Sequence, residues 1–125
     1  MSTKRILIVE DNYDNRAIYT EIFRYAGYEV IEAVNGREGV ARAREVRPEV
    51  IIMDLSMPVF TGWEALAALK ADEETASIPV FALSAHVLME GDYQKAIRSG
   101  FVGYITKPVE PKQVLERVRE LIGAP

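Results

Sequence analysis

Short apolar runs alternate five times with longer segments whose apolar residues recur at helical spacing. Short runs rich in β-branched residues and bounded by turn residues are typical of fully buried strands. We predict strands over residues 5–9, 29–33, 50–53, 80–83 and 102–105. We predict helices over about 13–26, from Asn35-Gly36 to just before Pro48, around Trp63 to Leu69, over about 87–98, and from Pro111 onward. The predicted buried stripe of the last helix consists of Val114, Val118, Leu121 and Ile122.

Strict alternation of strands and helices predicts a parallel sheet that is covered by helices on both faces. The first, third and fourth strands are the most apolar and belong in the centre, whereas Glu29 and Glu32 suit the second strand to an edge. With right-handed crossovers the order 2-1-3-4-5 fits, and its switch point lies between the first and third strands. The predicted fold class is therefore α/β, a doubly wound, flavodoxin-like (βα)5 fold with a five-stranded parallel sheet.

Composition narrows the classes of protein that remain. The chain has 125 residues and no linker or low-complexity stretch, so we expect one domain over residues 1–125 with no output domain. A formal net charge of -4 leaves no surplus of Lys and Arg for phosphates, which argues against direct nucleic-acid binding. The absence of cysteine excludes disulfides, thiolate nucleophiles and zinc–thiolate sites. The apolar run before Glu10 is too short for a secretory signal and no run reaches membrane-spanning length, so we expect a cytoplasmic protein without membrane contact.

Chemically active side chains follow four of the predicted strands at the point where each strand ends. Glu10-Asp11, Asp54, Ser84 and Lys107 would share one edge of a parallel sheet, where open α/β sheets bind their ligands. Three carboxylates at one mouth would repel one another unless a hard divalent cation compensates them. Mg²⁺ (or Mn²⁺) prefers carboxylate oxygens and leaves positions open for a substrate phosphate. Glu10, Asp11 and Asp54 are therefore the predicted metal ligands.

The same edge suits phosphoryl transfer, because Lys107 adds a positive charge and Ser84 adds a hydroxyl beside the metal. Catalysis of this transfer is mainly positioning and charge neutralisation, and a carboxylate can be the nucleophile. Asp54 is the best candidate because it ends a central strand. Taken singly, each residue also has a structural interpretation. Glu10-Asp11 suits a solvated loop or helix cap, Asp54 a turn, Ser84 a helix N-cap, and Lys107 a surface position.

Over essentially its whole length the sequence resembles the receiver domain of two-component response regulators. The motifs that carry the resemblance are Ile8-Val9-Glu10-Asp11-Asn12, Met53-Asp54-Leu55-Ser56-Met57-Pro58 with Gly62 beyond, Leu83-Ser84-Ala85, and Gly103-Tyr104-Ile105-Thr106-Lys107-Pro108. The resemblance implies that Asp54 accepts a phosphoryl group from a phosphohistidine. It also implies that Asp11, Asp54 and the backbone carbonyl of Ser56 ligate Mg²⁺, with Glu10 acting through water. Ser84 would contact the phosphoryl group, and Lys107 would pair with it.

The resemblance further implies a switch and a set of partners. Ser84 would move toward the phosphate and Tyr104 would rotate inward, which would remodel the face formed by the fourth helix, fifth strand and fifth helix. Tyr104 is open to a second interpretation, as a strand residue with its hydroxyl at the surface. The Lys107-Pro108 peptide bond would be cis. The input partner would be a sensor histidine kinase or a histidine phosphotransfer protein at the first helix, and a downstream protein would bind the remodelled face.

Three alternatives stay open at the level of sequence. A flavodoxin-like electron carrier needs a phosphate-cradling first loop, but Glu10-Asp11-Asn12 would repel phosphate without a metal. A phosphohydrolase of the haloacid dehalogenase type would want a second acid where Ser56 stands, together with a cap over its substrate. The third is a receiver that only binds partners; the complete acidic set, Ser84 and Lys107 argue against it. A receiver would not be an enzyme beyond its own phosphorylation and dephosphorylation.

Overall fold

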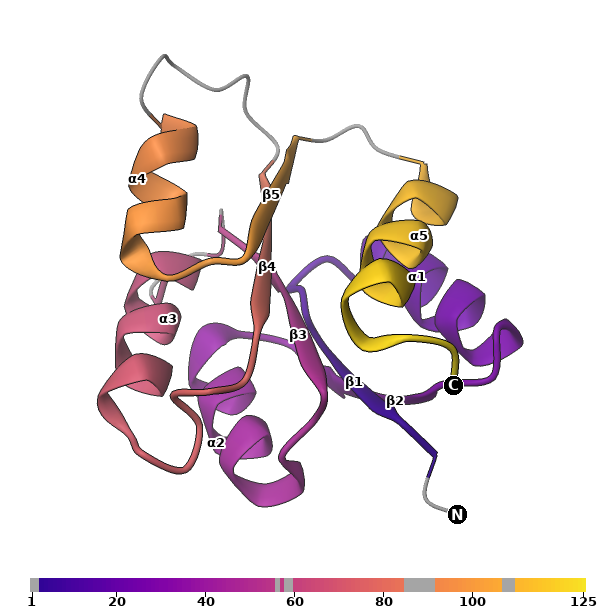
Figure 1. Cartoon of the computed structure of the whole chain (residues 1–125), viewed down its shortest axis with the longest axis horizontal. Coiled ribbons are helices and arrows are strands. Elements are labelled where there is room, and N and C mark those ends of the chain that lie inside the picture. The colour runs from indigo at the N-terminus through magenta and orange to yellow at the C-terminus, as the bar shows by residue number, and fades with distance from the viewer. Residues whose placement is uncertain (1–2, 56, 58–59, 85–91, 107–109) are drawn as a thin grey trace.

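One parallel sheet of five strands forms the centre of the molecule (Figure 1). The computed structural model describes residues 3–55, 57, 60–84, 92–106 and 110–125. The strands are β1 (Arg5–Val9), β2 (Glu29–Ala33), β3 (Val50–Asp54), β4 (Val80–Ser84) and β5 (Gly103–Thr106). Their order is β2-β1-β3-β4-β5 and every neighbouring pair is parallel, which confirms the predicted topology.

Helices cover both faces of the sheet, as strict strand–helix alternation requires. The helices are α1 (Tyr13–Tyr25), α2 (Gly36–Val46), α3 (Gly62–Ala71), α4 (Asp92–Ser99) and α5 (Pro111–Ile122). Figure 1 shows α2, α3 and α4 on one side of the sheet and α1 and α5 on the other. None of the helices, over the residues described, is both long enough and apolar enough to cross a bilayer.

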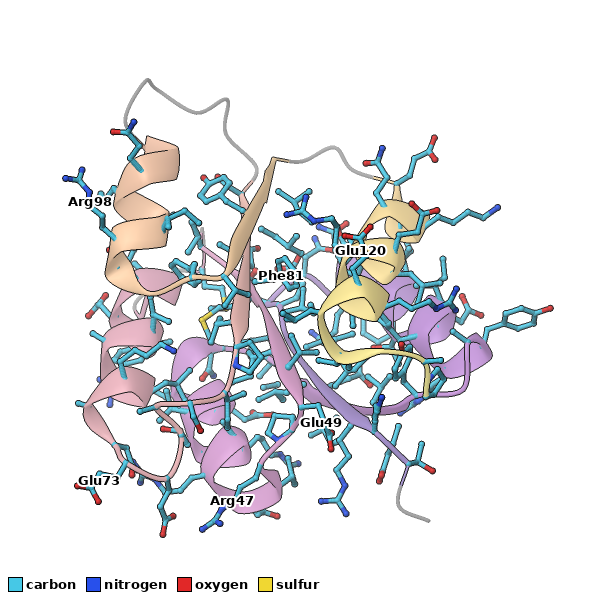
Figure 2. The ribbon with its side chains drawn as sticks, viewed as in Figure 1. Arg47, Glu49, Glu73, Phe81, Arg98 and Glu120 are labelled. Carbon is cyan, nitrogen blue, oxygen red and sulfur yellow. The ribbon has the colours of Figure 1, made fainter. Side chains whose placement is uncertain are left out.

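Two apolar layers follow from the period of two along each strand. Leu7 of β1 and Met53 of β3 pack into the layer beneath α2, α3 and α4. Ile8 of β1 and Ile52 of β3 pack into the layer beneath α1 and α5. Phe81 is buried, whereas the five charged side chains labelled in Figure 2 are exposed. Because both faces of the sheet are covered, the central strands are apolar throughout instead of alternating.

Four predicted strand boundaries differ from the structure by one residue, namely the ends of β3 and β4 and both ends of β5. β3 and β4 continue to Asp54 and Ser84, because the ladder pairs Asp54 with Leu83 and Ser84 with Thr106. β5 begins at Gly103 instead of residue 102. The start predicted for the fourth helix, at residue 87, lies outside the described residues, and α4 is described from Asp92.

The predicted stripe of the last helix is wrong at Leu121, which is 42% exposed. Val114 and Val118 are fully buried, and Leu115 and Ile122 pack against them. At 100° per residue, the centre of the buried face formed by these four side chains lies between Val118 and Ile122 around the helix. Leu121 falls at the margin of that face, on the far side of Val114. The spacing alone does not reveal on which side of the Val114–Val118 row the sheet lies.

An aromatic pair joins α3 to the segment after α4. The rings of Trp63 and Phe101 meet edge to face, with centroids 5.5 Å apart and an interplanar angle of 77°. The ammonium of Lys95, on α4, lies 4.8 Å from the centroid of the Trp63 ring. Phe101 is 2% exposed, so this contact belongs to the core beneath α3 and α4.

Candidate functional site

The carboxyl ends of the parallel strands bring the predicted site residues to one edge of the sheet. The register pairs Val9 with Met53, so the residues that follow, Glu10 and Asp54, come side by side. Ser84 pairs with Thr106 at the same edge, one strand further along. This edge includes the switch point between β1 and β3, and doubly wound sheets bind ligands at such a point.

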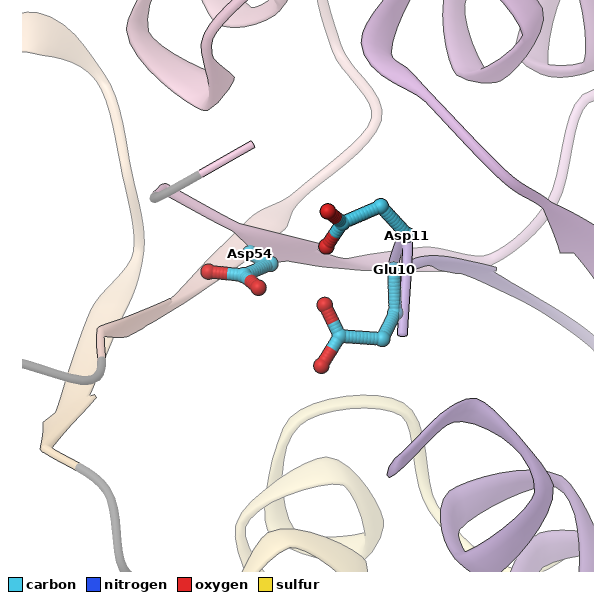
Figure 3. A group of neighbouring side chains, drawn as sticks. All are labelled: Glu10, Asp11 and Asp54. Carbon is cyan, nitrogen blue, oxygen red and sulfur yellow. The ribbon is translucent and has the colours of Figure 1, made fainter. Parts of the chain in front are cut away.

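Three carboxylates meet at this edge. Glu10, Asp11 and Asp54 each offer an oxygen, and these oxygens lie within 4.8 Å of one another (Figure 3). Glu10 is 1% exposed and Asp54 is 5% exposed, whereas Asp11 is open to solvent. Carboxylates held together and shielded from water repel one another, and a hard divalent cation relieves that repulsion. The donor set therefore fits Mg²⁺, which prefers oxygen ligands.

Local backbone contacts fix the turn that carries two of the carboxylates. The N–H of Glu10 donates to the carbonyl oxygen of Ala33 at 3.1 Å, which continues the ladder beyond the end of β1. Asn12 is the N-cap of α1, and its side chain accepts from the N–H of Asn15 at 2.9 Å. Asp11 thus stands between a residue held by β2 and a residue held by α1.

Gly62 lets the start of α3 pack against the backbone of Asp54. A β-carbon at Gly62 would lie 2.6 Å from the carbonyl oxygen of Asp54 and 2.9 Å from the Cα of Leu55. These distances are too short for any larger residue. The glycine named among the sequence motifs therefore has a packing role beside the candidate site.

Ser84 and Tyr104 lie on the same face of the sheet. The register pairs Tyr104 with Ala82, and Ser84 is two residues beyond Ala82, so both side chains belong to the face toward α3 and α4. Ser84 is 4% exposed and Tyr104 is 9% exposed. Tyr104 packs into the apolar cluster beneath those helices, which matches an inward position more closely than a surface one.

Part of the predicted site lies outside the described residues. Ser56, Lys107 and Pro108 are not among them, so the predicted carbonyl ligand, the predicted ammonium and the cis peptide bond stay predictions. Two of their described neighbours lie at the same edge of the sheet as Asp54. Leu55 follows β3 directly, and Thr106 is the last residue of β5.

Sequence reasoning missed Arg16, on the first turns of α1. Its side chain is 11% exposed, and its guanidinium donates from Nη1 to the carbonyl oxygen of Glu10 at 2.8 Å. It also donates from Nε to a carboxylate oxygen of Glu32 at 3.1 Å. A backbone acceptor has no residue signature, so only the arginine's place near the acidic pair could have pointed to it.

Comparison with known proteins agrees with the fold. The family model of the response regulator receiver domain matches residues 6–119. The chain therefore belongs to the response regulator receiver domain family, whose members act in two-component signalling. It shares 37% of residues with the polar-differentiation response regulator DivK of Brucella anthropi, over 96% of this chain and 97% of the relative.

Solved structures give the same assignment. The chemotaxis protein CheY4 of Vibrio cholerae superposes with a TM-score of 0.88 at 30% identity, over 96% of this chain and 99% of that one. The receiver domain of the sensor histidine kinase PA1611 from Pseudomonas aeruginosa superposes with a TM-score of 0.86 at 30% identity, over 98% of this chain and 100% of that one. That relative holds a magnesium ion in its active-site cleft.

Proposed function

We propose that this protein is a phosphoacceptor receiver in which Asp54 takes a phosphoryl group from a phosphohistidine in a Mg²⁺-dependent reaction. The observation that carries the proposal is the approach of Glu10, Asp11 and Asp54 to within 4.8 Å at the end of two central strands. Asp54 is the acceptor because it is the last residue of β3 and can face both a metal and an incoming ligand.

The transfer is a displacement at phosphorus. A carboxylate oxygen of Asp54 attacks, the bond between phosphorus and the imidazole nitrogen breaks, and the imidazole leaves and takes up a proton. Bound Mg²⁺ (or Mn²⁺) would neutralise the charge that gathers on the phosphoryl oxygens. Asp11, Asp54 and the backbone carbonyl of Ser56 would hold it, with Glu10 acting through water. Ser84 would donate to the phosphoryl group and Lys107 would pair with it across the cleft.

Phosphorylation would be read out through Ser84 and Tyr104. Both belong to one face of the sheet, so movement of Ser84 toward the phosphate would open space beside Tyr104. The Lys107-Pro108 bond would be cis. A downstream protein would bind the face of α4, β5 and α5, where Gln94, Ile97, Arg98 and Val102 line a groove.

The input partner would be a sensor histidine kinase or a histidine phosphotransfer protein. Exposed apolar side chains on α1 support this docking surface: Tyr13 is 72% exposed, Ile18 49% and Tyr25 95%. Because kinases draw their phosphoryl groups from ATP, we place the protein in the cytoplasm. We also propose that residues 1–125 form a single domain. We expect no direct contact with nucleic acid or membrane, and no catalysis beyond its own phosphorylation and dephosphorylation.

Acetyl phosphate tests the proposal without a partner. We expect one added phosphoryl group by intact-protein mass spectrometry in the presence of Mg²⁺, no adduct in Asp54→Asn, and suppression by a chelator. Glu120→Gln is the matched control, since it alters an exposed carboxylate on α5. Persistence of the adduct in Asp54→Asn would overturn the assignment.

Two other results would redirect the function. Absence of any adduct, with partner binding intact, would favour a receiver that acts only by binding. Turnover of small phosphomonoesters would favour a phosphohydrolase, against which the family match already argues.

A further inference from the structure

Arg16 contacts two strand ends at once. Its guanidinium donates from Nη1 to the carbonyl oxygen of Glu10 at 2.8 Å and from Nε to Oε1 of Glu32 at 3.1 Å. Glu10 follows β1, and Glu32 belongs to β2. A planar guanidinium can meet two acceptors in fixed directions, which a lysine ammonium does less well.

The carbonyl that Arg16 holds belongs to the peptide bond between Glu10 and Asp11. That bond is planar, so a fixed carbonyl also fixes the direction in which the chain enters Asp11. The N–H of Glu10 is held on its other side by the carbonyl of Ala33. Beyond Asp11, the side chain of Asn12 caps α1. Arg16 thus completes a set of contacts that holds the turn between β1 and α1.

Glu32 compensates the positive charge of Arg16, because the two side chains form an ion pair. Its removal would therefore change two quantities with opposite effects on cation binding. Loss of a positive charge near three carboxylates would strengthen Mg²⁺ binding. Loss of the contact to the Glu10 carbonyl would let the turn move and would weaken Mg²⁺ binding. The sign of the change identifies the dominant effect.

We propose that Arg16 is a positioning residue, which sets the Mg²⁺ affinity of the Glu10–Asp11–Asp54 cluster by orienting the turn that presents Glu10 and Asp11. This inference rests on the proposed function, because it concerns the metal site of that function. Outer contacts that orient metal ligands change metal affinity by about 10–100-fold. We expect about a tenfold loss in Arg16→Ala, at the low end, because Arg16 holds backbone and not a ligand side chain.

Isothermal titration calorimetry with MgCl2, on the full chain and without a phosphodonor, measures the affinity directly. We expect weaker binding in Arg16→Ala and intermediate binding in Arg16→Lys, since one ammonium satisfies one of the two acceptors well. Arg24→Ala is the matched control, because it removes the same charge from the same helix at an exposed position. Its Mg²⁺ affinity should equal or slightly exceed that of the unchanged protein.

Thermal unfolding in EDTA accompanies each titration, so that weaker binding is compared among folded proteins. If Arg16→Ala does not fold, Arg16→Lys decides. Unchanged or tighter Mg²⁺ binding in the folded Arg16 variants would overturn the inference while leaving the proposed function intact. Mg²⁺ binding that is absent from the unchanged protein, or insensitive to Asp11→Asn, would overturn the metal site and the inference together.

Discussion

At the scale of single residues, Gly103 makes room for an aromatic ring of the neighbouring strand. A β-carbon there would overlap the ring of Phe81, and it would lie 3.2 Å from Nη2 of Arg117. The guanidinium of Arg117 in turn lies 5.7 Å from the centroid of that ring. Gly103 is therefore required by close packing across β4, β5 and α5, and it has no left-handed backbone conformation to explain it.

We expect Gly103→Ala to lower the free energy of unfolding by about 2–3 kcal/mol, because overpacking a filled core forces neighbours to shift. Urea denaturation measures the change. Phe81→Leu in the same background should recover part of the loss, since it removes the ring that the new methyl group meets. Equal stability of Gly103→Ala and the unchanged protein would contradict the packing role.

The residues of the site were predictable to the extent that strand ends determine them. Glu10, Asp11 and Asp54 could be grouped because each follows or ends a strand of a parallel sheet. Arg16 could not, since its acceptor at Glu10 is a backbone carbonyl with no sequence signature. Leu121 was assigned to the core by spacing and is exposed.

At the scale of elements, α3 begins with a capping box directly beside the candidate site. Thr61 Oγ1 accepts from the N–H of Glu64 at 3.2 Å, and Glu64 Oε1 accepts from the N–H of Thr61 at 3.1 Å. These two bonds satisfy donors that the first turn of a helix leaves open. Gly62, the next residue, packs on the backbone of Asp54. The cap therefore fixes the end of α3 that packs on the backbone of Asp54.

We expect Thr61→Ala to lower the free energy of unfolding by about 1 kcal/mol, the usual cost of losing an N-cap side chain. Thr61→Ser is the matched control, because it keeps the hydroxyl, and it should cost much less. Chemical denaturation of the three proteins checks this expectation. An alanine variant as stable as the serine variant would show that the hydroxyl contributes nothing.

The ends of strands could be predicted from the sequence where burial of side chains determines them, but not where backbone pairing with a neighbouring strand does. β1 matches its predicted range because its apolar run stops at Glu10, and β2 ends as predicted at Ala33, before Val34, which is 43% exposed. β3 and β4 run one residue further, to Asp54 and Ser84, because backbone pairing continues under a polar side chain. Hydropathy does not predict that extension, which places both candidate site residues inside the sheet.

At the scale of the whole molecule, the structure confirms the predicted strand order. The order could be predicted because apolar central strands and right-handed crossovers leave few arrangements. That order brings carboxylates from separate strands together. Their mutual repulsion opposes folding, so the acidic site is a cost that the rest of the fold offsets. Lys107 and Ser56 lie outside the described residues, and their places at this edge stay predictions.

We expect Asp54→Asn to raise the free energy of unfolding by about 1–2 kcal/mol in EDTA, because it removes one of three neighbouring negative charges. The midpoint of thermal unfolding should rise by about 4–8 °C. Saturating Mg²⁺ should narrow the gap, since the ion stabilises the unchanged protein more than the variant. Differential scanning calorimetry with and without Mg²⁺ makes the comparison. A lower midpoint for the variant in EDTA would show that repulsion is not the dominant effect.

Trp63 is the only tryptophan of the chain, and it lies under a cation from α4 and against the ring of Phe101. Its ultraviolet emission therefore depends on where α4 stands. A shift of that helix would change the distance between Lys95 and the indole, and with it the brightness and colour of the emitted light. Stopped-flow mixing could then time the response of α4 in unlabelled protein.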